Sequence, residues 1–132
     1  MSDYLEVQLR AHIFRTASFT KPAALWVSLH TADPTDTGSG AEANYGAYAR
    51  VQRDPLDANW TAASATDGNT DNAAAITFPQ CTSGTNTITH FGIWDASVAG
   101  NLITYGTLTV SQVIAVGGTP SFAIGALDIT FQ

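Results

Sequence analysis

Apolar and polar residues alternate most clearly between Thr87 and Thr109, in two runs separated by a short loop. The loop, residues 97–101, ends in Gly100 and Asn101, a pair that readily takes positive φ. Apolar residues occur on both faces of both runs, so neither face has the composition of a fully solvated one. This pattern predicts a central β-hairpin in a two-layer sandwich, with one face in the core and the other packed or bound by a partner.

The segment 2–16 has the pattern of an amphipathic helix. Ser2 is a suitable N-cap, acidic residues occupy the first turn, and Arg10 and Arg15 lie toward the C-terminal end, as the helix dipole favours. The apolar stripe consists of Leu5, Leu9 and Ile13, widened by Tyr4 and Phe14. Pro22 prevents a longer helix. We therefore expect one domain, with residues 1–22 as a helix and arm and residues 23–132 as the sandwich.

Five further segments have strand-like composition. They are Ala24–His30, Gly46–Val51, Ala73–Phe78, Val110–Val116 and Pro120–Phe131. Asp54-Pro55 indicates a sheet edge, because proline cannot donate to a strand ladder, and Gly125 indicates a bulge where the alternation slips. Residues 60–72, with Asp67-Gly68 near their middle, predict a loop or a loose hairpin tip. Seven to eight strands predict a mainly-β fold, an antiparallel, jelly-roll-like β-sandwich with one N-terminal α-helix.

Only 12% of the 132 residues are charged, so Thr, Ser, Asn and Gly must supply much of the polar surface. Such a surface is common in β proteins that assemble into particles or fibres. The net charge of −6 is distributed unevenly. The five bases, Arg10, Arg15, Lys21, Arg50 and Arg53, are balanced by five acids within residues 1–53, and the remaining residues carry six acids and no base.

This distribution argues against nucleic acid or an anionic membrane as a partner. Two interpretations of the basic N-terminal part remain open. The bases are there by chance, or this part docks on an acidic neighbour. The N-terminus lacks the pattern of a signal peptide, and no apolar run approaches the length of a membrane span. We therefore expect a protein that is made and kept in a cytoplasm, or released from it by lysis.

Catalytic and metal-binding patterns are weak throughout the chain. His12, His30 and His90 do not have the spacing of a metal site, and His30 is better explained as holding the turn that follows it. Asp33, Asp36 and Glu42 share a loop and suggest calcium, but their spacing matches no known calcium loop. Cys81 cannot form an internal disulfide and is expected to be a buried or inert thiol. We assign no catalytic, metal-binding or cofactor-binding residue.

Aromatic residues offer two interpretations. The set Trp26, Trp60, Trp94, Tyr45, Tyr48 and Tyr105 suits either a sugar-stacking surface or the core and subunit contacts. The second use is more frequent in small β proteins. Trp60 is the one expected to be exposed, because its surroundings are polar.

Three blocks occur in a fixed order, with LHTADP first, Tyr48-Ala49-Arg50 next and THFGIWDA last. With these blocks, residues 24–131 resemble a family of small tailed-bacteriophage virion proteins, commonly described as tail-fibre-like or structural. The chain departs from the family pattern around residues 53–60, where Asp54-Pro55 interrupts the strand. The resemblance implies a non-enzymatic virion component that is assembled in the host cytoplasm.

Two hypotheses follow for its place in the particle. The first is a homotrimeric capsid decoration, or cement, protein that stabilises the outer surface of the head by binding the major capsid protein or another virion protein. Its charge pairs would come from Arg10, Arg15, Arg50 and Arg53. The alternative is a tail-fibre or tail-tip adhesin that recognises a host glycan through Trp60. A third class, a small hydrolase, has the least support.

Overall fold

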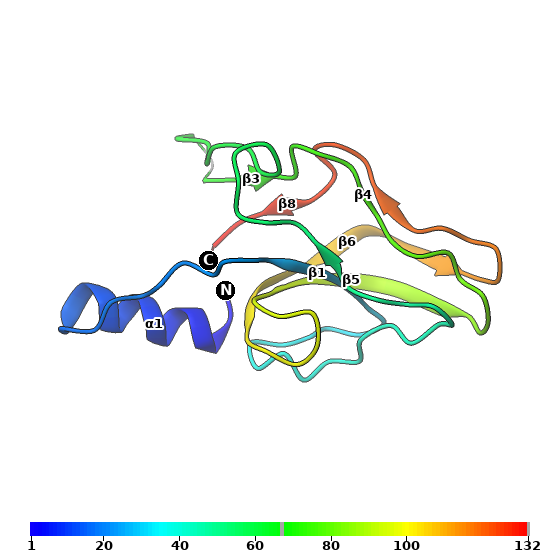
Figure 1. The fold of residues 1–132 in the computed structure, drawn as a ribbon, viewed down its shortest axis with the longest axis horizontal. Coiled ribbons are helices and arrows are strands. Elements are labelled where there is room, and N and C mark those ends of the chain that lie inside the picture. The colour runs from blue at the N-terminus through cyan, green and yellow to red at the C-terminus, as the bar shows by residue number, and fades with distance from the viewer. Residues whose placement is uncertain (67, 132) are drawn as a thin grey trace.

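The computed structural model describes residues 1–66 and 68–131 and shows a mainly-β fold with one N-terminal helix (Figure 1). The elements are α1 (Asp3–Phe14), β1 (Trp26–His30), β2 (Val51–Gln52), β3 (Thr70–Asp71), β4 (Ile76–Thr77), β5 (Asn86–Trp94), β6 (Leu102–Ile114), β7 (Ser121–Phe122) and β8 (Asp128–Ile129). The predicted fold class is confirmed, since every strand pairing is antiparallel.

The strands form one larger sheet and two short ribbons. The sheet has the order β2-β1-β5-β6, and the ribbons pair β3 with β8 and β4 with β7. The ribbons lie over one face of the sheet, and the chain from 31 to 50 crosses the other face (Figure 1). This arrangement is consistent with a β-sandwich in which one layer is continuous and the other is made of short ribbons.

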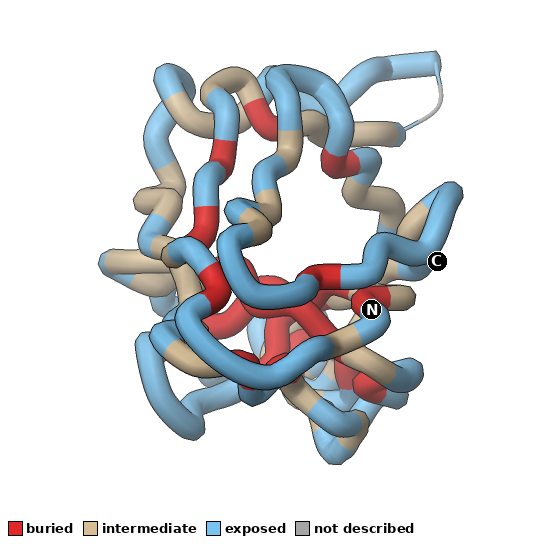
Figure 2. The backbone as a smooth tube through the Cα atoms, turned by 90° about the vertical axis from the view of Figure 1, so that its right-hand side faces the viewer, coloured by how far each residue is buried: buried red, intermediate tan, exposed pale blue. Residues whose placement is uncertain are grey.

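Alternation along β1 and β5 explains which face of the sheet becomes the core. Val27 pairs with Ile93 and Leu29 with Phe91, so four apolar side chains share the face toward the ribbons. Ile76, Phe78 and Leu127 cover them from the ribbon layer. Figure 2 shows the buried residues gathered around the sheet, with exposed backbone at the periphery. Packing of these apolar faces is the main stabilising term of the fold.

The predicted helix is confirmed, with slightly shorter bounds. The Ser2 hydroxyl accepts a hydrogen bond from the Leu5 amide, and Arg15 is already extended, so the helix ends at Phe14. The apolar stripe is only partly used, because Leu5 is buried while Ile13 and Phe14 are exposed. The stripe is therefore packed within the domain at its N-terminal end and open to solvent at its C-terminal end. The last turn projects beyond the sheet (Figure 1).

Two strands are shorter in the structure than the sequence pattern predicts. The Gly46–Val51 run contains Ala47 at φ 71°, and the Tyr48 amide closes a turn onto the Tyr45 carbonyl, so pairing begins only at Val51. The run Ala73–Phe78 retains strand pairing only as β4. In the first run, turn hydrogen bonding outweighs β-propensity. The edge predicted near Asp54-Pro55 is confirmed, because β2 is an edge strand and ends at Gln52.

The C-terminal part differs most from the prediction. The segment Val110–Val116 is not a separate strand, because its first five residues continue β6 to Ile114. Nor is Pro120–Phe131 one strand, since β7 and β8 are separated by a turn in which Gly125, at φ 71°, donates to the Asn72 carbonyl. Gly125 is therefore a turn residue and not a bulge. The fully buried Asn72 side chain donates to the Ala123 carbonyl and accepts from the Leu127 amide, and these bonds fix the turn.

The central hairpin is confirmed, with its loop at residues 97–101. Positive φ falls on Ala99 and Gly100 and not on Gly100 and Asn101 as predicted, because the Asp95 carboxylate holds Asn101 through its amide and its side chain. Trp60 bridges to Asn72, so the polar segment between these two residues is a loose hairpin. Asp67, at its predicted tip, lies outside the described residues. Among the described helices, none is long and apolar enough to cross a membrane.

Candidate functional site

The residues predicted to bind partners divide into two groups. Arg10 and Arg15 are exposed on the projecting part of α1, where Arg10 makes only a 3.9 Å contact with Glu6. Arg50 and Arg53 instead make internal contacts. The structure thus gives Arg50 and Arg53 roles within the domain and leaves Arg10 and Arg15 in solvent.

Arg50 is the centre of a polar cluster beneath the second face of the sheet. We name the side chains of Ser28, His30, Glu42, Tyr48, Arg50 and Trp94 the Arg50 cluster. The Arg50 guanidinium forms a two-pronged ion pair with Glu42, with nitrogen–oxygen distances of 2.9 and 2.8 Å. It also donates to the carbonyls of Ala96 and Ala99. Its carbon lies 4.0 Å from the centroid of the Trp94 ring, in a cation–π contact.

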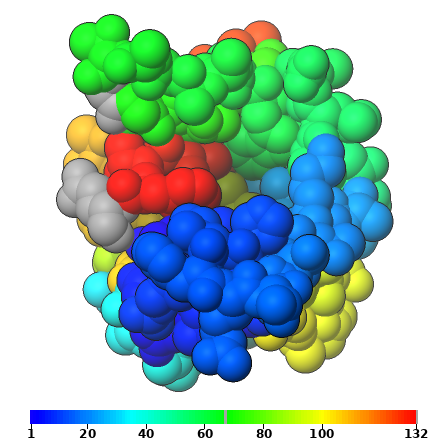
Figure 3. Space-filling view, turned by 90° about the vertical axis from the view of Figure 1, so that its left-hand side faces the viewer, coloured from blue at the N-terminus to red at the C-terminus, as the bar shows by residue number. Residues whose placement is uncertain are grey.

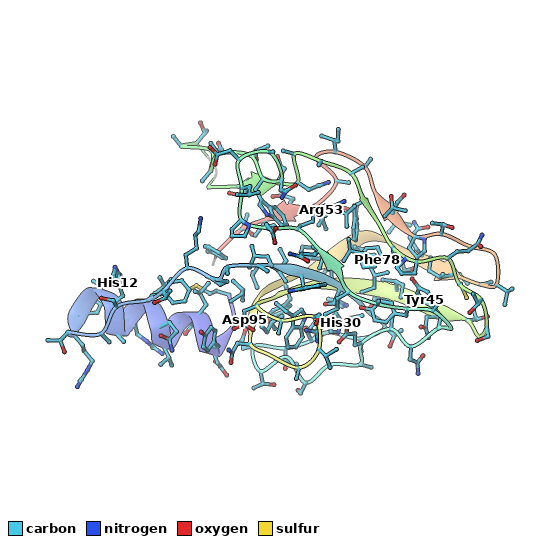
Figure 4. The ribbon with its side chains drawn as sticks, viewed as in Figure 1. His12, His30, Tyr45, Arg53, Phe78 and Asp95 are labelled. Atoms are coloured by element: carbon cyan, nitrogen blue, oxygen red, sulfur yellow. The ribbon has the colours of Figure 1, made fainter. Side chains whose placement is uncertain are left out.

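These bonds connect three separate parts of the chain. Glu42 lies in the crossing segment, Arg50 just before the edge strand β2, and Ala96 and Ala99 in the hairpin loop. A single guanidinium therefore fixes the crossing segment and the hairpin loop against the same face of the sheet. The same side of the sheet holds His30, which Figure 4 labels.

His30 and Ser28 form a hydrogen-bonded chain inside this cluster. The Gly40 carbonyl can only accept, so His30 Nδ1 carries a proton and Nε2, 2.8 Å from the Ser28 hydroxyl, accepts. The Trp94 indole donates to the same hydroxyl at 2.8 Å. A Ser–His pair can be a nucleophile and base, but here both residues are fully buried. The pair holds the Gly40 turn, as predicted for His30.

Burial of the Arg50 cluster shifts the pKa values of its titratable side chains. Burial lowers the pKa of His30, and although the Glu42 carboxylate opposes this effect, the imidazole remains neutral. Burial by itself raises the pKa of Glu42, but hydrogen bonds from Arg50 and Tyr48 outweigh it, so the carboxyl's pKa is lowered. Burial also raises the pKa of Tyr48 strongly. All three groups keep the protonation state that their hydrogen bonds require.

Acid is expected to destabilise the fold through the protonation of His30 and of Glu42. Because the pKa of His30 is lowered on folding, the unfolded chain binds more protons than the folded one below its usual pKa of about 6.5. Stability is therefore fully present above that pH and falls as the pH decreases. Protonation of Glu42, whose folded pKa is also lowered, removes more stability below about pH 4.5. Thermal melts from about pH 8 to 5 test the first step.

The variant His30→Gln is expected to flatten the pH dependence between about pH 7 and 5, whatever its effect on overall stability. His12→Gln is the matched control for the loss of an imidazole, because His12 is exposed on α1. An unchanged slope in His30→Gln would contradict this assignment.

Gly92 explains why the THFGIWDA block needs a glycine at its centre. A Cβ there would lie 2.8 Å from Ser28 Oγ, 2.9 Å from Trp94 Nε1 and 3.1 Å from His30 Nε2. Gly92→Ala is therefore expected to lower the free energy of unfolding by about 1–3 kcal/mol, the usual cost of overpacking. Urea denaturation followed by tryptophan fluorescence measures the effect. An unchanged urea midpoint would contradict this prediction, because the neighbouring side chains would then accommodate the methyl group without loss of stability.

Trp60 lies beside a groove at the other side of the sheet. The indole is half-buried, and its nitrogen donates to the carbonyls of Asp54, at 3.1 Å, and Arg53. The expectation that Trp60 is exposed is therefore wrong, because its polar loop folds back onto the chain near β2. The Arg53 guanidinium donates to the Ala75 and Gln52 carbonyls, which ties β2 to the ribbon layer.

We name the adjacent cavity, of about 800 Å³, the Trp60 groove. Its walls include Leu25, Pro55, Leu56, Trp60, Ile129 and Phe131. The core face of the sheet reaches it through Ile93, Ile103 and Thr104. Figure 3 shows this end of the molecule, with the C-terminal strand above the helix and the 50–60 segment beside it. No sequence pattern predicted the groove, because its apolar residues Leu56, Trp60, Ile129 and Phe131 lie in short, separate segments.

The other predicted aromatic residues do not form a sugar-stacking surface with Trp60. Tyr45 and Trp94 are buried, and Tyr48 packs edge-to-face against Tyr45 with ring centroids 5.3 Å apart. Tyr105 donates to Asp36, and this hydrogen bond raises the pKa of Tyr105 to about 12. The prediction that most of these aromatic residues serve the core is confirmed.

The proposed calcium ligands are occupied elsewhere. Asp33 accepts from the Thr35 amide in the turn, Asp36 accepts from Tyr105, and Glu42 pairs with Arg50. Within residues 1–66 and 68–131, no group of three histidine, cysteine or acidic side chains is placed to hold a metal ion. Cys81 is buried, as predicted.

The geometry thus defines a small mainly-β domain with a largely buried polar cluster, and its exposed features include the end of α1, the outer part of β6 and an apolar groove. Residues 1–130 match the family model described as podophage GP4 fiber I protein gp80. The chain belongs to this family, which makes it a bacteriophage virion structural protein. Curated proteins gave no match.

Proposed function

We propose that this protein is a structural subunit of a bacteriophage tail fibre. The observation that carries the proposal is the match of residues 1–130 to a podophage fibre family. Decoration of the head was the first hypothesis from the sequence. The match favours the tail location instead. The protein's partners are further copies of itself, as in the predicted homotrimer, or another virion protein.

The surface of the domain suits such an assembly role. Large apolar side chains are exposed along α1 and on the outer part of β6 with the turn after it. They are Val7, Ile13, Phe14, Val110, Val113 and Val116. Exposed apolar patches of this kind are used for protein–protein contacts. The proposed role requires no catalysis, no cofactor, no nucleic acid and no membrane.

Assembly is favoured over glycan recognition by the position of Trp60. Its indole nitrogen is used by backbone carbonyls, and the groove beside it is walled mainly by apolar side chains. Sugar hydroxyls lose their hydrogen bonds to water when they bind. A glycan site therefore needs several polar groups around the stacking ring to replace those bonds. The polar lining residues are Lys21, Asp57, Thr61, Thr70 and Thr104, a minority of the lining, and Thr104 is buried.

Labelling the intact particle tests the proposed function. An antibody raised against the purified protein, imaged by electron microscopy, is expected to mark the tail. Particles assembled without the protein serve as the control for nonspecific labelling. Signal distributed over the head would overturn the fibre proposal and favour decoration.

A further inference from the structure

We propose that two copies of the chain associate through the outer part of β6, with their β6 strands side by side and antiparallel across a two-fold axis. We name residues 107–116, with the sequence TLTVSQVIAV, the β6 edge. The inference rests on the proposed function in one respect, because a fibre subunit must associate with other subunits. It adds the surface and the mode of contact.

β6 lies at the edge of the sheet, with β5 as its neighbour on one side. An edge strand presents a row of unpaired backbone N–H and C=O groups on its other side. At the start of β6, Ser2 satisfies the Leu102 and Ile103 carbonyls through its hydroxyl and its amide. After Ile103, no backbone group of β6 bonds to any described segment other than β5. The outer part of β6 can therefore accept a further strand.

The β6 edge is exposed on both of its faces. Neighbouring residues of a strand point to opposite faces, yet Thr109–Val113 are all exposed. Val110 is 65% exposed, and Val113 and Val116 are each 67% exposed. Figure 1 shows this part of β6 and the turn into β7 at the end of the molecule away from α1, so the helix does not cover it. The surface is open to a second molecule.

A bulge weakens the pairing of the β6 edge within its own domain. Ile88 of β5 pairs with Gln112, and two residues further along β5, His90 pairs with Thr107. A single residue of β5 therefore lies opposite residues 108–111, and the regular ladder is lost there. Pairing resumes at Gln112, so the strand beyond the bulge remains extended. The bulged residues have unused backbone groups in addition to those of an ordinary edge.

Composition identifies the occupant as a second copy. Between Asp95 and Asp128 the chain has no charged residue, and the β6 edge has no proline, although charges and prolines are what usually protect an exposed edge from pairing. Uncharged segments with many β-branched residues are those that pair with identical segments. The rest of the chain carries the net charge of −6, so copies repel one another elsewhere but not where this segment meets itself.

A cleft beside β6 gives the contact an apolar component. Its volume is about 520 Å³, and it opens between Val110 and Ile114 of β6 and Phe122 of β7. Leu29 and Ile88 of the core also line it, so the two layers are not sealed along β6. A two-fold axis perpendicular to the sheet pairs the strands antiparallel and places both ribbon layers on the same side. The second copy then covers the cleft, and burial of its apolar walls stabilises the pair.

The first test is the mass of the protein in solution, measured by light scattering over a range of concentrations. The wild type is expected to form a species with an even number of copies. Val113→Lys is expected to weaken self-association by about tenfold or more, because it puts two like charges into one small contact. Val98→Lys is the matched control, since it changes the net charge equally at a residue 81% exposed in the hairpin loop. A monomeric or trimeric wild type, or an unchanged Val113→Lys species, would overturn the inference.

Amide hydrogen exchange tests whether the backbones pair. Amides of the β6 edge are expected to exchange about tenfold more slowly, or slower still, in the associated wild type than in Val113→Lys, because a second strand protects them. Amides of β5 serve as the internal control, since β5 has a partner on both sides in a single copy. An associated wild type without this added protection would overturn strand pairing.

A mixture of two variants tests whether the same edge of both copies takes part. Val113→Lys and Val113→Asp are each expected to associate weakly alone and to associate together, because opposite charges then meet across the axis. A mixture that stays monomeric would overturn the two-fold contact. This failure is separate from that of the proposed function. Tail labelling of the particle would still support the fibre role, whereas labelling over the head would overturn that role and leave the β6 contact in place.

Discussion

Arg50→Ala is expected to lower the free energy of unfolding by about 3–4 kcal/mol, a large part of the stability of a small domain. The Arg50 side chain is 6% exposed, and its partner Glu42 is 28% exposed. Removing the guanidinium leaves that carboxylate half-buried without its ion pair, and also leaves the Ala96 and Ala99 carbonyls without a donor. The cation–π contact with Trp94 is lost as well.

Urea denaturation of dilute protein, followed by tryptophan fluorescence, measures this effect without a contribution from assembly. Arg15→Ala is the charge-matched control, because Arg15 is exposed and its loss should cost less than about 0.5 kcal/mol. Arg50→Lys keeps the charge but not the two-pronged geometry, and is expected to lie between the two. If Arg50→Ala resembled Arg15→Ala, the cluster would contribute little to stability, and Arg50 would again be a candidate for partner binding.

Local patterns predicted the parts of the fold that depend on local physics. The α1 helix begins where Ser2 can cap it, and the central hairpin lies where two alternating runs flank a loop that permits positive φ. Each of these choices is made by residues a few positions apart. They could therefore be predicted without knowing the rest of the chain.

Contacts between distant segments decided the rest. Arg50 appeared to be a surface base because its Glu42 partner is useful only once the crossing segment folds beneath the sheet. Asn72 divides the C-terminal run into two strands by bonding to Ala123 and Leu127, more than fifty residues away in sequence. Neither side chain carries a local signal of this role.

The candidate groove illustrates the same limit. Its walls come from the N-terminal arm, the segment after β2, and β8 at the C-terminus, and none of these has a binding motif of its own. The concentration of all five bases in residues 1–53 left docking on an acidic neighbour as one of two interpretations, and Arg10 and Arg15 are exposed bases to which it would apply.

Phe78→Ala is expected to cost about 3–5 kcal/mol, because it opens a cavity between the two layers. Phe78 is 2% exposed and lies between the ribbons and the sheet (Figure 4). Its ring contacts Phe122 edge-to-face, with centroids 6.0 Å apart, and stacks on Tyr48 at 6.5 Å. Because the Tyr48 hydroxyl also donates to Glu42, the aromatic core and the Arg50 cluster share one side chain.

This shared side chain gives the prediction a second measurable consequence. In a double-mutant cycle, the losses in free energy of unfolding caused by Phe78→Ala and Arg50→Ala should not be additive. Each substitution loosens Tyr48, so the second one then costs less than it does alone. An interaction energy of at least about 0.5 kcal/mol is expected. Combining Phe78→Ala with Val98→Ala, an exposed substitution in the hairpin loop, should be additive. Additivity in both cycles would mean that the two faces of the sheet are stabilised independently, with Tyr48 transmitting nothing between them.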